Sequence, residues 1–361
     1  MEVSILDLKK QYHDLKDEID SEISKVLESG YFILGKEEKK FEAKIKDYLD
    51  TDNDCIGVAS GSDALLLSLM AIDISPGDEV ITTPFTFFAT AGAISRLGAK
   101  PVFVDIGDDY NIDVDKISEK INENTKAIIT VDLFGNPSDL KRLRKICDDN
   151  DLYLIDDACQ AIGSEIDGKK IGNFAHFTCF SFFPTKNLGA YGDGGLVVVE
   201  GDEMSEKIRM LRKHGSKKKY HHEFVGINSR LDEMQAAILN VKLDYLDEWI
   251  DKRQKNAKIY SDNLKEIINV PKIDDNKKHV FHQYTISVDD RDGLKEYLSD
   301  NGIQTAVYYP VPLHLQNCFD NDVSLSNSEY ASSHVLSLPI HENLNINEIH
   351  YVIDKIKEFY D

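Results

Sequence analysis

The chain has 361 residues, of which 42% are hydrophobic and 29% charged, so it is long enough for a large core and a smaller companion unit. Its 42 basic and 64 acidic residues give a net charge of −22, which argues against nucleic acid or an anionic membrane as the main partner. No apolar run approaches the length of a membrane-spanning helix, and the charged N-terminus lacks the apolar core of a signal peptide. We therefore expect a cytoplasmic protein.

The cysteines point away from disulfides and from a structural metal. Their number is odd and no CxxC spacing occurs, which predicts reduced thiols and no zinc site. The five are Cys55, Cys147, Cys159, Cys179 and Cys318.

The predicted elements begin with two helices and continue as an alternation. Apolar residues at helical spacing predict a helix over 7–29, ended by Gly30, and a second helix over 37–49. From about residue 55, short apolar runs alternate with longer amphipathic stretches. The runs predict a short strand before Gly57 and strands at 79–82, 102–105, 127–131, 152–155, 177–182 and 196–199. The amphipathic stretches predict helices at 62–73, 86–97, 113–122 and 138–149.

This alternation predicts an α/β fold with a mostly parallel central sheet flanked by helices. In such sheets ligands bind beyond the carboxyl ends of the strands, so residues that directly follow each apolar run are the candidates for function.

The pattern changes towards the C-terminus. A long helix is predicted over 230–249, with Ser229 and Asp232 as a capping box. Beyond it, helices are predicted at 251–267, 292–300 and 346–359, and strands at 280–288 and near 306–309. We expect two domains: residues 1–250, with the N-terminal helices and the large α/β unit, and residues 251–361, a small α+β unit.

The first candidate segment is the Ser/Gly-rich turn at 57–64, which contains Gly61 and Ser62 and opens a predicted helix. Free backbone N–H groups at a helix N-terminus, together with the helix dipole, favour a phosphate group. The turn matches neither GxxxxGK[ST] nor GxGxxG, and an ordinary helix cap remains the alternative.

The second segment, 154–160, ends a strongly apolar strand with Asp156 and Asp157. A carboxylate at this edge could pair with a protonated ring nitrogen, and a helix-capping aspartate is an equally good reading. The third segment, 180–189, places Lys186 after an apolar strand among aromatic residues and proline. Desolvation lowers a lysine pKa and makes the amine nucleophilic, as a Schiff base requires, although most loop lysines are simply surface residues.

The order of these three segments is more specific than any one of them. A phosphate turn precedes an aspartate at a strand end, and Lys186 follows 29 residues after Asp157. A pyridoxal 5'-phosphate (PLP) site needs such parts: an anchor for the phosphate, a carboxylate for the pyridine nitrogen and an amine for the aldehyde.

These motifs resemble those of the DegT/DnrJ/EryC1/StrS sugar aminotransferases, which have the fold-type I PLP architecture. The resemblance covers nearly the whole chain. Its most specific pieces are SGSDAL at 60–65, PFTFFAT at 84–90, DACQ at 157–160, SFFPTK at 181–186, GDGG at 192–195 and NSRLDEMQAA at 228–237.

The resemblance implies a role for each matched residue. Lys186 would bind the cofactor and later move protons, Asp157 would pair with the pyridine nitrogen, and Gln160 would hydrogen-bond the ring hydroxyl. Phe87 would stack on the ring, whereas its neighbour Phe88 reads nearly as well as a core aromatic. The phosphate would be held by Gly61, Ser62, Ser181 and, from the other subunit of a homodimer with shared active sites, Asn228.

One stretch departs from the charge of the chain. Residues 209–222 contain six Lys/Arg and no acid. Such a sign inversion favours a loop that meets phosphates, and a solvated basic loop is the alternative at even odds. In the family this loop reaches the active site of the neighbouring subunit, which favours a substrate carried on a nucleotide diphosphate.

The substrate residues implied by the resemblance are Tyr220, His221, Arg230, Tyr308 and Tyr309. Relatives often have His-Tyr before the proline where this chain has Tyr308-Tyr309, so the identity of the sugar stays open. The segment 220–230 resembles members that aminate C3 of the sugar more than those that aminate C4.

The expected reaction is a ping-pong transamination. Glutamate would convert bound PLP to pyridoxamine phosphate (PMP), which would then aminate a UDP- or dTDP-linked keto sugar. Two alternatives remain: a PLP-dependent sugar dehydratase or lyase, and a non-catalytic regulatory binding protein on the same scaffold. Family dehydratases carry histidine in place of the lysine, so the presence of Lys186 argues against the first.

Overall fold

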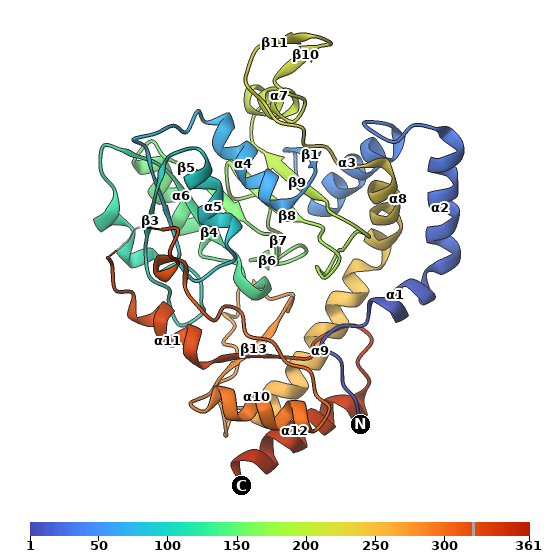
Figure 1. Ribbon diagram of the computed structural model, residues 1–361, viewed down its shortest axis with the longest axis vertical. Helices are drawn as coiled ribbons and strands as arrows, with labels where there is room; N and C mark the ends of the chain where they lie inside the picture. Colours follow the sequence, from blue (N-terminus) through green and yellow to red (C-terminus); the bar gives the residue numbers. More distant parts are fainter. Residues whose placement is uncertain (320–321) are drawn as a thin grey trace.

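The computed structural model describes residues 1–319 and 322–361. Its centre is a seven-stranded sheet with the strand order β1-β9-β8-β5-β4-β2-β3 (Figure 1). The strands from β8 to β3 run parallel, whereas β9 runs antiparallel to both of its neighbours. The predicted α/β fold with a mostly parallel sheet is confirmed. The strands are β1 (Asp54–Val58), β2 (Glu79–Thr82), β3 (Lys100–Phe103), β4 (Thr125–Val131), β5 (Tyr153–Asp157), β8 (Phe177–Ser181) and β9 (Gly195–Val199).

Two hydrophobic layers cover the sheet because successive strand residues point to opposite faces. In β4, Ala127 and Ile129 pack with α4 (Gly61–Ala71), α5 (Ala89–Arg96) and α7 (Asp202–Leu211). Ile128 points the other way. The helices on that second face are α3 (Lys36–Leu49), α6 (Leu140–Asp149) and α8 (Glu233–Lys242).

Two predicted helices differ from the structure. The helix expected over 7–29 is broken at Leu15 into α1 (Leu8–Asp14) and α2 (Lys16–Ser29). The helix expected over 113–122 is wrong, since this segment forms only two short 3-10 turns, η1 (Val114–Lys116) and η2 (Ser118–Lys120). Its acidic and basic residues alternate on an exposed surface and bury only Val114 and Ile117 fully, too little apolar surface for a packed helix.

The long helix also begins and ends elsewhere than predicted. α8 starts at Glu233, and after the turn η4 (Leu243–Tyr245) the chain continues as α9 (Leu246–Leu264). The predicted capping box is wrong, because Asp232 is the N-cap residue without a side-chain bond and the Ser229 hydroxyl accepts from the Ala59 N–H (3.0 Å). Ser229 thus ties the start of α8 to the turn before α4.

The C-terminal part has a hydrophobic core of its own, built from α9, α10 (Arg291–Asp300), α12 (Ile346–Tyr360) and the antiparallel pair β13 (Tyr284–Ser287) and β14 (Val335–Leu338). The strand expected over 280–288 is therefore shorter, and the one near 306–309 is reduced to a single bridge from Ala306 to Ser337. Val3 joins this core, so both ends of the chain lie beside it (Figure 1). α9 runs across residue 250, and the division into 1–250 and 251–361 stays a prediction.

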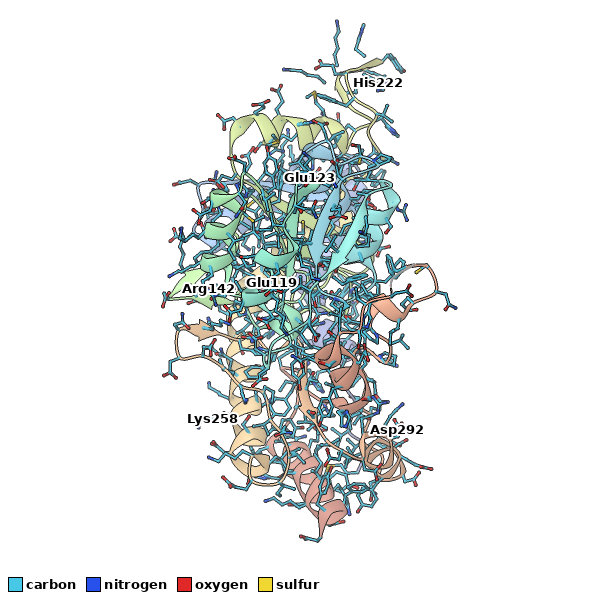
Figure 2. The ribbon with its side chains drawn as sticks, turned by 90° about the vertical axis from the view of Figure 1, so that its left-hand side faces the viewer. Glu119, Glu123, Arg142, His222, Lys258 and Asp292 are labelled. Carbon is cyan, nitrogen blue, oxygen red and sulfur yellow. The ribbon has the colours of Figure 1, made fainter. Side chains whose placement is uncertain are left out.

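Several smaller elements had no sequence signal. A three-stranded sheet joins β12 (Lys277–Lys278), β6 (Glu165–Ile166) and β7 (Lys169–Lys170), and α11 (Ser326–His334) precedes β14. The basic stretch forms a hairpin of β10 (Ser216–Lys218) and β11 (His221–His222), which projects from one end of the molecule with His222 near its tip (Figure 2). Within the described residues, no helix combines the length and apolarity needed to cross a membrane.

Candidate active site

A cavity of about 710 Å³ lies at the carboxyl ends of β4, β5 and β8. Asp157 is the last residue of β5 and Ser181 the last of β8, so the parallel strands deliver both side chains to the same edge. The cavity brings together nine of the predicted residues: Gly61, Ser62, Phe87, Asp157, Gln160, Ser181, Lys186, Tyr308 and Tyr309.

The N-terminus of α4 forms one wall of this cavity. The Ser60 side chain caps the helix by accepting from the Asp63 N–H (3.1 Å), while the N–H groups of Gly61 and Ser62 have no acceptor within the described residues. A Cβ atom on Gly61 would lie 2.7 Å from Cys159 Sγ and from Ser181 Cβ. The glycine therefore allows β5, β8 and the helix end to meet, and leaves two N–H donors facing an open space suited to an anion.

Asp157 is held by one strong hydrogen bond. Thr90 Oγ1 donates to its Oδ2 (2.7 Å) and shares a second bond with Thr86 Oγ1 (3.0 Å). The carboxylate is 6% exposed and lines the cavity. Its neighbour Asp156 points to the opposite face, where burial raises the pKa of its carboxyl well above its usual range. The two acids are adjacent in the sequence. Because successive residues of a strand point to opposite faces of the sheet, their side chains lie in different surroundings.

Lys186 lines the same cavity from the loop after β8. Its backbone N–H donates to Phe183 O (2.9 Å), which closes the turn, whereas its Nζ has no hydrogen-bond or ion-pair partner among the described residues. Burial lowers the pKa of this amine, against the attraction of Cys159 and Asp157. A desolvated, unpaired amine is a nucleophile at a lower pH than an exposed lysine.

Gln160 is engaged within the protein. Its Oε1 accepts from the Phe134 N–H (2.8 Å), and its Nε2 donates to the Tyr309 hydroxyl (3.1 Å). Burial raises the pKa of Tyr309. The Phe87 ring lies tilted at 6.4 Å from the Tyr309 ring and is 56% exposed, so it forms the open side of the cavity.

Sequence reasoning missed some of the lining. Thr86 and Thr90 lie in the quoted segment 84–90, so their proximity to Asp157 could have been inferred from the strand-end rule. His282 and Gln283 come from the C-terminal part and had no local signal. Burial lowers the pKa of His282, which contacts Asn187 through Nδ1 (3.3 Å).

Four predicted residues do not line this cavity within the chain: Tyr220, His221, Asn228 and Arg230. Tyr220 is 81% exposed on the projecting hairpin, and His221 and Asn228 are also exposed. No group of three or more His, Cys, Asp or Glu side chains placed to hold a metal ion was found in 1–319 or 322–361.

Comparison with known proteins agrees with this geometry. The model of the DegT/DnrJ/EryC1/StrS aminotransferase family matches residues 13–357. A pleiotropic regulatory protein of Geobacillus stearothermophilus is 48% identical, over 100% of this chain and 99% of its own. The UDP-N-acetyl-3-dehydro-alpha-D-glucosamine 3-aminotransferase of Acidithiobacillus ferrooxidans is 42% identical, over 96% and 95% of the two chains.

Among solved structures, that of S. venezuelae DesV in complex with a ketimine intermediate superposes with a TM-score of 0.97. It is 40% identical and covers 100% of this chain and 99% of its own. The match therefore extends over the large α/β part, the C-terminal part and the cavity. This chain belongs to the DegT/DnrJ/EryC1/StrS aminotransferase family.

Proposed function

We propose that this protein is a PLP-dependent aminotransferase that converts a nucleotide-linked keto sugar into the amino sugar. The observation that carries the proposal is the meeting of three groups in one cavity: the unpaired amine of Lys186, the Asp157 carboxylate and the free N–H groups at the start of α4. An aminotransferase needs all three at once, since they serve different ends of one cofactor.

The residues present fit that cofactor. The close packing allowed by Gly61 leaves a cradle of N–H donors for the phosphate, to which the Ser181 side chain is adjacent. Asp157 keeps one strong donor, Thr90, and its carboxylate still faces the cavity, where a protonated ring nitrogen would complete its hydrogen bonds. The exposed face of Phe87 is free for stacking against the ring.

When bound, PLP supplies an electron sink for the carbanion formed during amino transfer. The chain positions the reacting groups around it. With the cofactor bound, Asp157 would favour the charged form of the ring nitrogen, and Lys186 Nζ would take up and release the proton that moves during amino transfer. The lowered pKa of Lys186 suits this work because the amine must both take up and release a proton near neutral pH. Gln160 and Tyr309, joined to each other, would orient the ring hydroxyl and the substrate.

The substrate proposal is a sugar on UDP or dTDP, with glutamate as amino donor and amination at C3. It is supported by the similarity to the A. ferrooxidans 3-aminotransferase and by the basic hairpin in an otherwise acidic chain. We further propose a cytoplasmic homodimer in which Tyr220, His221, Asn228 and Arg230 serve the partner's cavity. They do not line their own cavity, and the hairpin projects into solvent.

Two other functions share this scaffold. A sugar dehydratase would use the same cofactor without a net amino transfer, and the lysine at 186 counts against it. A regulatory binding role is favoured by the name of the G. stearothermophilus relative, which is 48% identical. A purely binding protein has no use for an unpaired, desolvated lysine opposite a buried carboxylate, so we propose the enzyme.

Colour and mass test the proposal. The protein purified with PLP should be yellow, borohydride should remove the absorbance band, and peptide mapping should place the reduced cofactor on Lys186. Mass spectrometry with UDP- and dTDP-linked 3-keto and 4-keto sugars and glutamate should then show the amino sugar and 2-oxoglutarate. A cofactor on another residue, or none, would refute the site, and dehydrated sugar without 2-oxoglutarate would show the dehydratase instead.

A further inference from the structure

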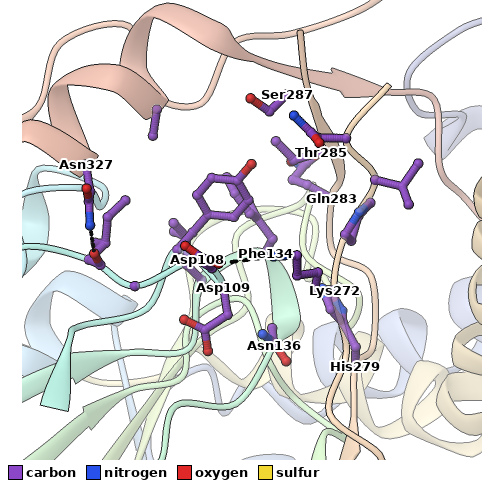
Figure 3. A pocket seen from close by; sticks show the side chains of 18 of the residues that line it. Asp108, Asp109, Phe134, Asn136, Lys272, His279, Gln283, Thr285, Ser287 and Asn327 are labelled. Atoms are coloured by element: carbon purple, nitrogen blue, oxygen red, sulfur yellow. Dashed lines mark hydrogen bonds and ion pairs between the residues drawn. The ribbon is translucent and has the colours of Figure 1, made fainter. Parts of the chain in front are cut away.

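A second cavity, of about 480 Å³, lies between the large α/β part and the C-terminal part (Figure 3). One wall is formed by the turn after β3, at 106–110, and by the turn η3 (Leu133–Gly135) with Asn136. The other wall comes from 265–272, from 279–287 and from the start of α11. None of these segments was singled out by the sequence motifs, and the proposed reaction does not use them.

Three of the charged groups that line this cavity, Asp108, Asp109 and Lys272, are in ion pairs, whereas Lys265 has none among the described residues. Lys272 pairs with Asp108 (3.0 Å), and Lys277, just outside the lining, pairs with Asp109 (3.5 Å). The Asp108–Lys272 pair is exposed on both sides. No unpaired phosphate-binding cluster is therefore present among the described lining residues, and an ionic ligand that contacts the paired groups would have to break their ion pairs.

Three neutral side chains of the lining, in contrast, keep an atom without a hydrogen-bond partner among the described residues. Asn136 is 4% exposed and its side-chain oxygen accepts no hydrogen bond from the described residues. The Gln283 side-chain amide also makes no hydrogen bond to them. His279 is 4% exposed and uses Nδ1 to accept from the Phe281 N–H (2.8 Å), so its Nε2 carries the proton as a donor. Burial lowers the His279 pKa to about 3 and keeps the ring neutral.

Aromatic surface completes the lining. The rings of Tyr110 and Phe134 pack edge to face at 5.7 Å, and Tyr330 on α11 is 51% exposed at the mouth. In Figure 3 the side chains of Phe134, Asn136, Gln283 and His279 surround the same space. Rings beside unpaired amides match a sugar, which presents C–H faces to aromatic rings and hydroxyls to amide groups.

We propose that this interdomain cavity binds a neutral, polyhydroxylated sugar, and that its occupancy is coupled to the active site through Phe134. The two cavities share part of their lining. The Phe134 N–H donates to Gln160 Oε1 (2.8 Å), the Gln283 N–H donates to Phe134 O (3.2 Å), and Gln283 lines both cavities.

Phe134 itself is held in a conformation that a side chain rarely adopts. Its φ is +60°, and the following Gly135 also has a positive φ of +95°. Such a residue persists only when its surroundings fix it. A sugar that contacts the Phe134 ring would contact the same residue whose N–H orients Gln160. Binding at one cavity therefore changes the affinity at the other, and each ligand changes the affinity for the other by the same factor.

Ligand-observed NMR with N-acetylglucosamine and glucose as probes tests the site directly. We expect saturable binding to the wild-type protein, weakened by roughly tenfold in Asn136→Ala, the loss typical of one hydrogen bond to a ligand, and also weakened in Tyr330→Ala. Asn136→Ala spares the backbone oxygen that accepts from Asn111 (3.0 Å), so the turn should keep its fold.

Matched controls lie outside the cavity. Asn343 also has an unpartnered buried amide atom, and Tyr360 is a similarly exposed ring on α12, so Asn343→Ala and Tyr360→Ala should bind the probe like wild type. Absence of saturable binding, or equal binding by wild type and Asn136→Ala, would overturn the site.

The coupling has a separate readout that does not depend on catalysis. The affinity for the probe should differ between protein with and without PLP, and equal affinities would overturn the coupling. Binding measured on the cofactor-free protein still tests the cavity if the proposed PLP chemistry fails.

Discussion

Two lysines near the active-site loop both have a lowered pKa, yet their surroundings differ. Lys242, at the end of α8, is completely buried, donates to Gly189 O (2.7 Å) and lies over the Tyr191 ring at 4.2 Å. Lys186 faces the cavity without any such partner. Burial lowers the pKa of both amines, to about 7 for Lys242.

Burial alone therefore does not distinguish a reactive lysine from a structural one. Lys242 connects α8 to the loop that follows Lys186, whereas Lys186 keeps its amine available to a ligand. The same contrast recurs in the acids at 156 and 157 and in the basic residues of the hairpin. In each case one residue or segment is the candidate for function, and another of the same residue type serves as its control.

The largest effect is expected from Lys186→Ala. Loss of the amine should lower kcat by about 1,000-fold or more, the scale of a lost general acid–base catalyst, and abolish the borohydride-trapped cofactor adduct. Lys242→Met should retain that adduct on Lys186. Steady-state kinetics and peptide mapping measure both, and Lys145→Ala, in an exposed ion pair with Asp149, serves as a surface control. An adduct on Lys242 in the wild-type protein or in Lys186→Ala would reverse the assignment.

Asp157→Asn should give the next largest loss. The amide keeps the shape that Thr90 contacts but no longer favours a charged ring nitrogen, and we expect kcat to fall on the order of 100-fold. Asp156→Asn should change kcat by less than about threefold, because the Asp156 side chain points away from the cavity and its burial, which raises the pKa of the carboxyl, favours a neutral group there. Equal losses in the two variants would show that the strand end, rather than the cavity-facing acid, is what matters.

The sequence predicts those parts of the candidate site that depend on residues close together in the chain. Strands that end near Asp157 and Ser181, and a helix that begins near Gly61, can be predicted to within two residues because apolar runs mark the strands and parallel strands share one edge. The proposed chemistry of Lys186 rests on the same rule together with the family resemblance. Alternation of β4 residues between the two cores is equally local.

Contacts between residues far apart in the chain cannot be predicted from the local pattern of apolar residues. The bond from Gln160 to Tyr309 spans 149 positions, and the contact of His282 with Asn187 beside the cavity spans 95. The 3-10 turns at 114–120 replaced a helix because little apolar surface there is buried. The second cavity likewise depends on how the C-terminal part packs against the turns after β3 and β4.

Variants of the hairpin test whether this basic segment, which does not line the cavity of its own chain, contributes to the active site of the partner subunit. Lys218→Ala with Lys219→Ala should raise KM for the nucleotide sugar by about tenfold at low salt and leave kcat nearly unchanged, since only ground-state charge pairing is lost. Lys9→Ala with Lys10→Ala, on the surface of α1, provides the matched loss of charge.

Mixing Lys186→Ala subunits with Asn228→Ala subunits should restore activity if the sites are shared, and no recovery in verified mixed dimers would contradict sharing.

The pH dependence of stability distinguishes the buried structural lysine from a surface one. The Lys242 amine loses its proton near pH 7 in the folded protein, whereas in the unfolded chain it keeps it up to about 10.5. Between these values the unfolded state binds more protons, so the free energy of unfolding should rise with pH, by at most about 1.4 kcal/mol per unit from this group. Lys242→Met should remove that contribution, whereas Lys258→Met, on an exposed lysine of α9, should not. Urea unfolding at pH 7, 8 and 9 measures the difference between variant and wild type, and parallel curves for wild type and Lys242→Met would mean that Lys242 stays charged through its contacts with Gly189 O and Tyr191.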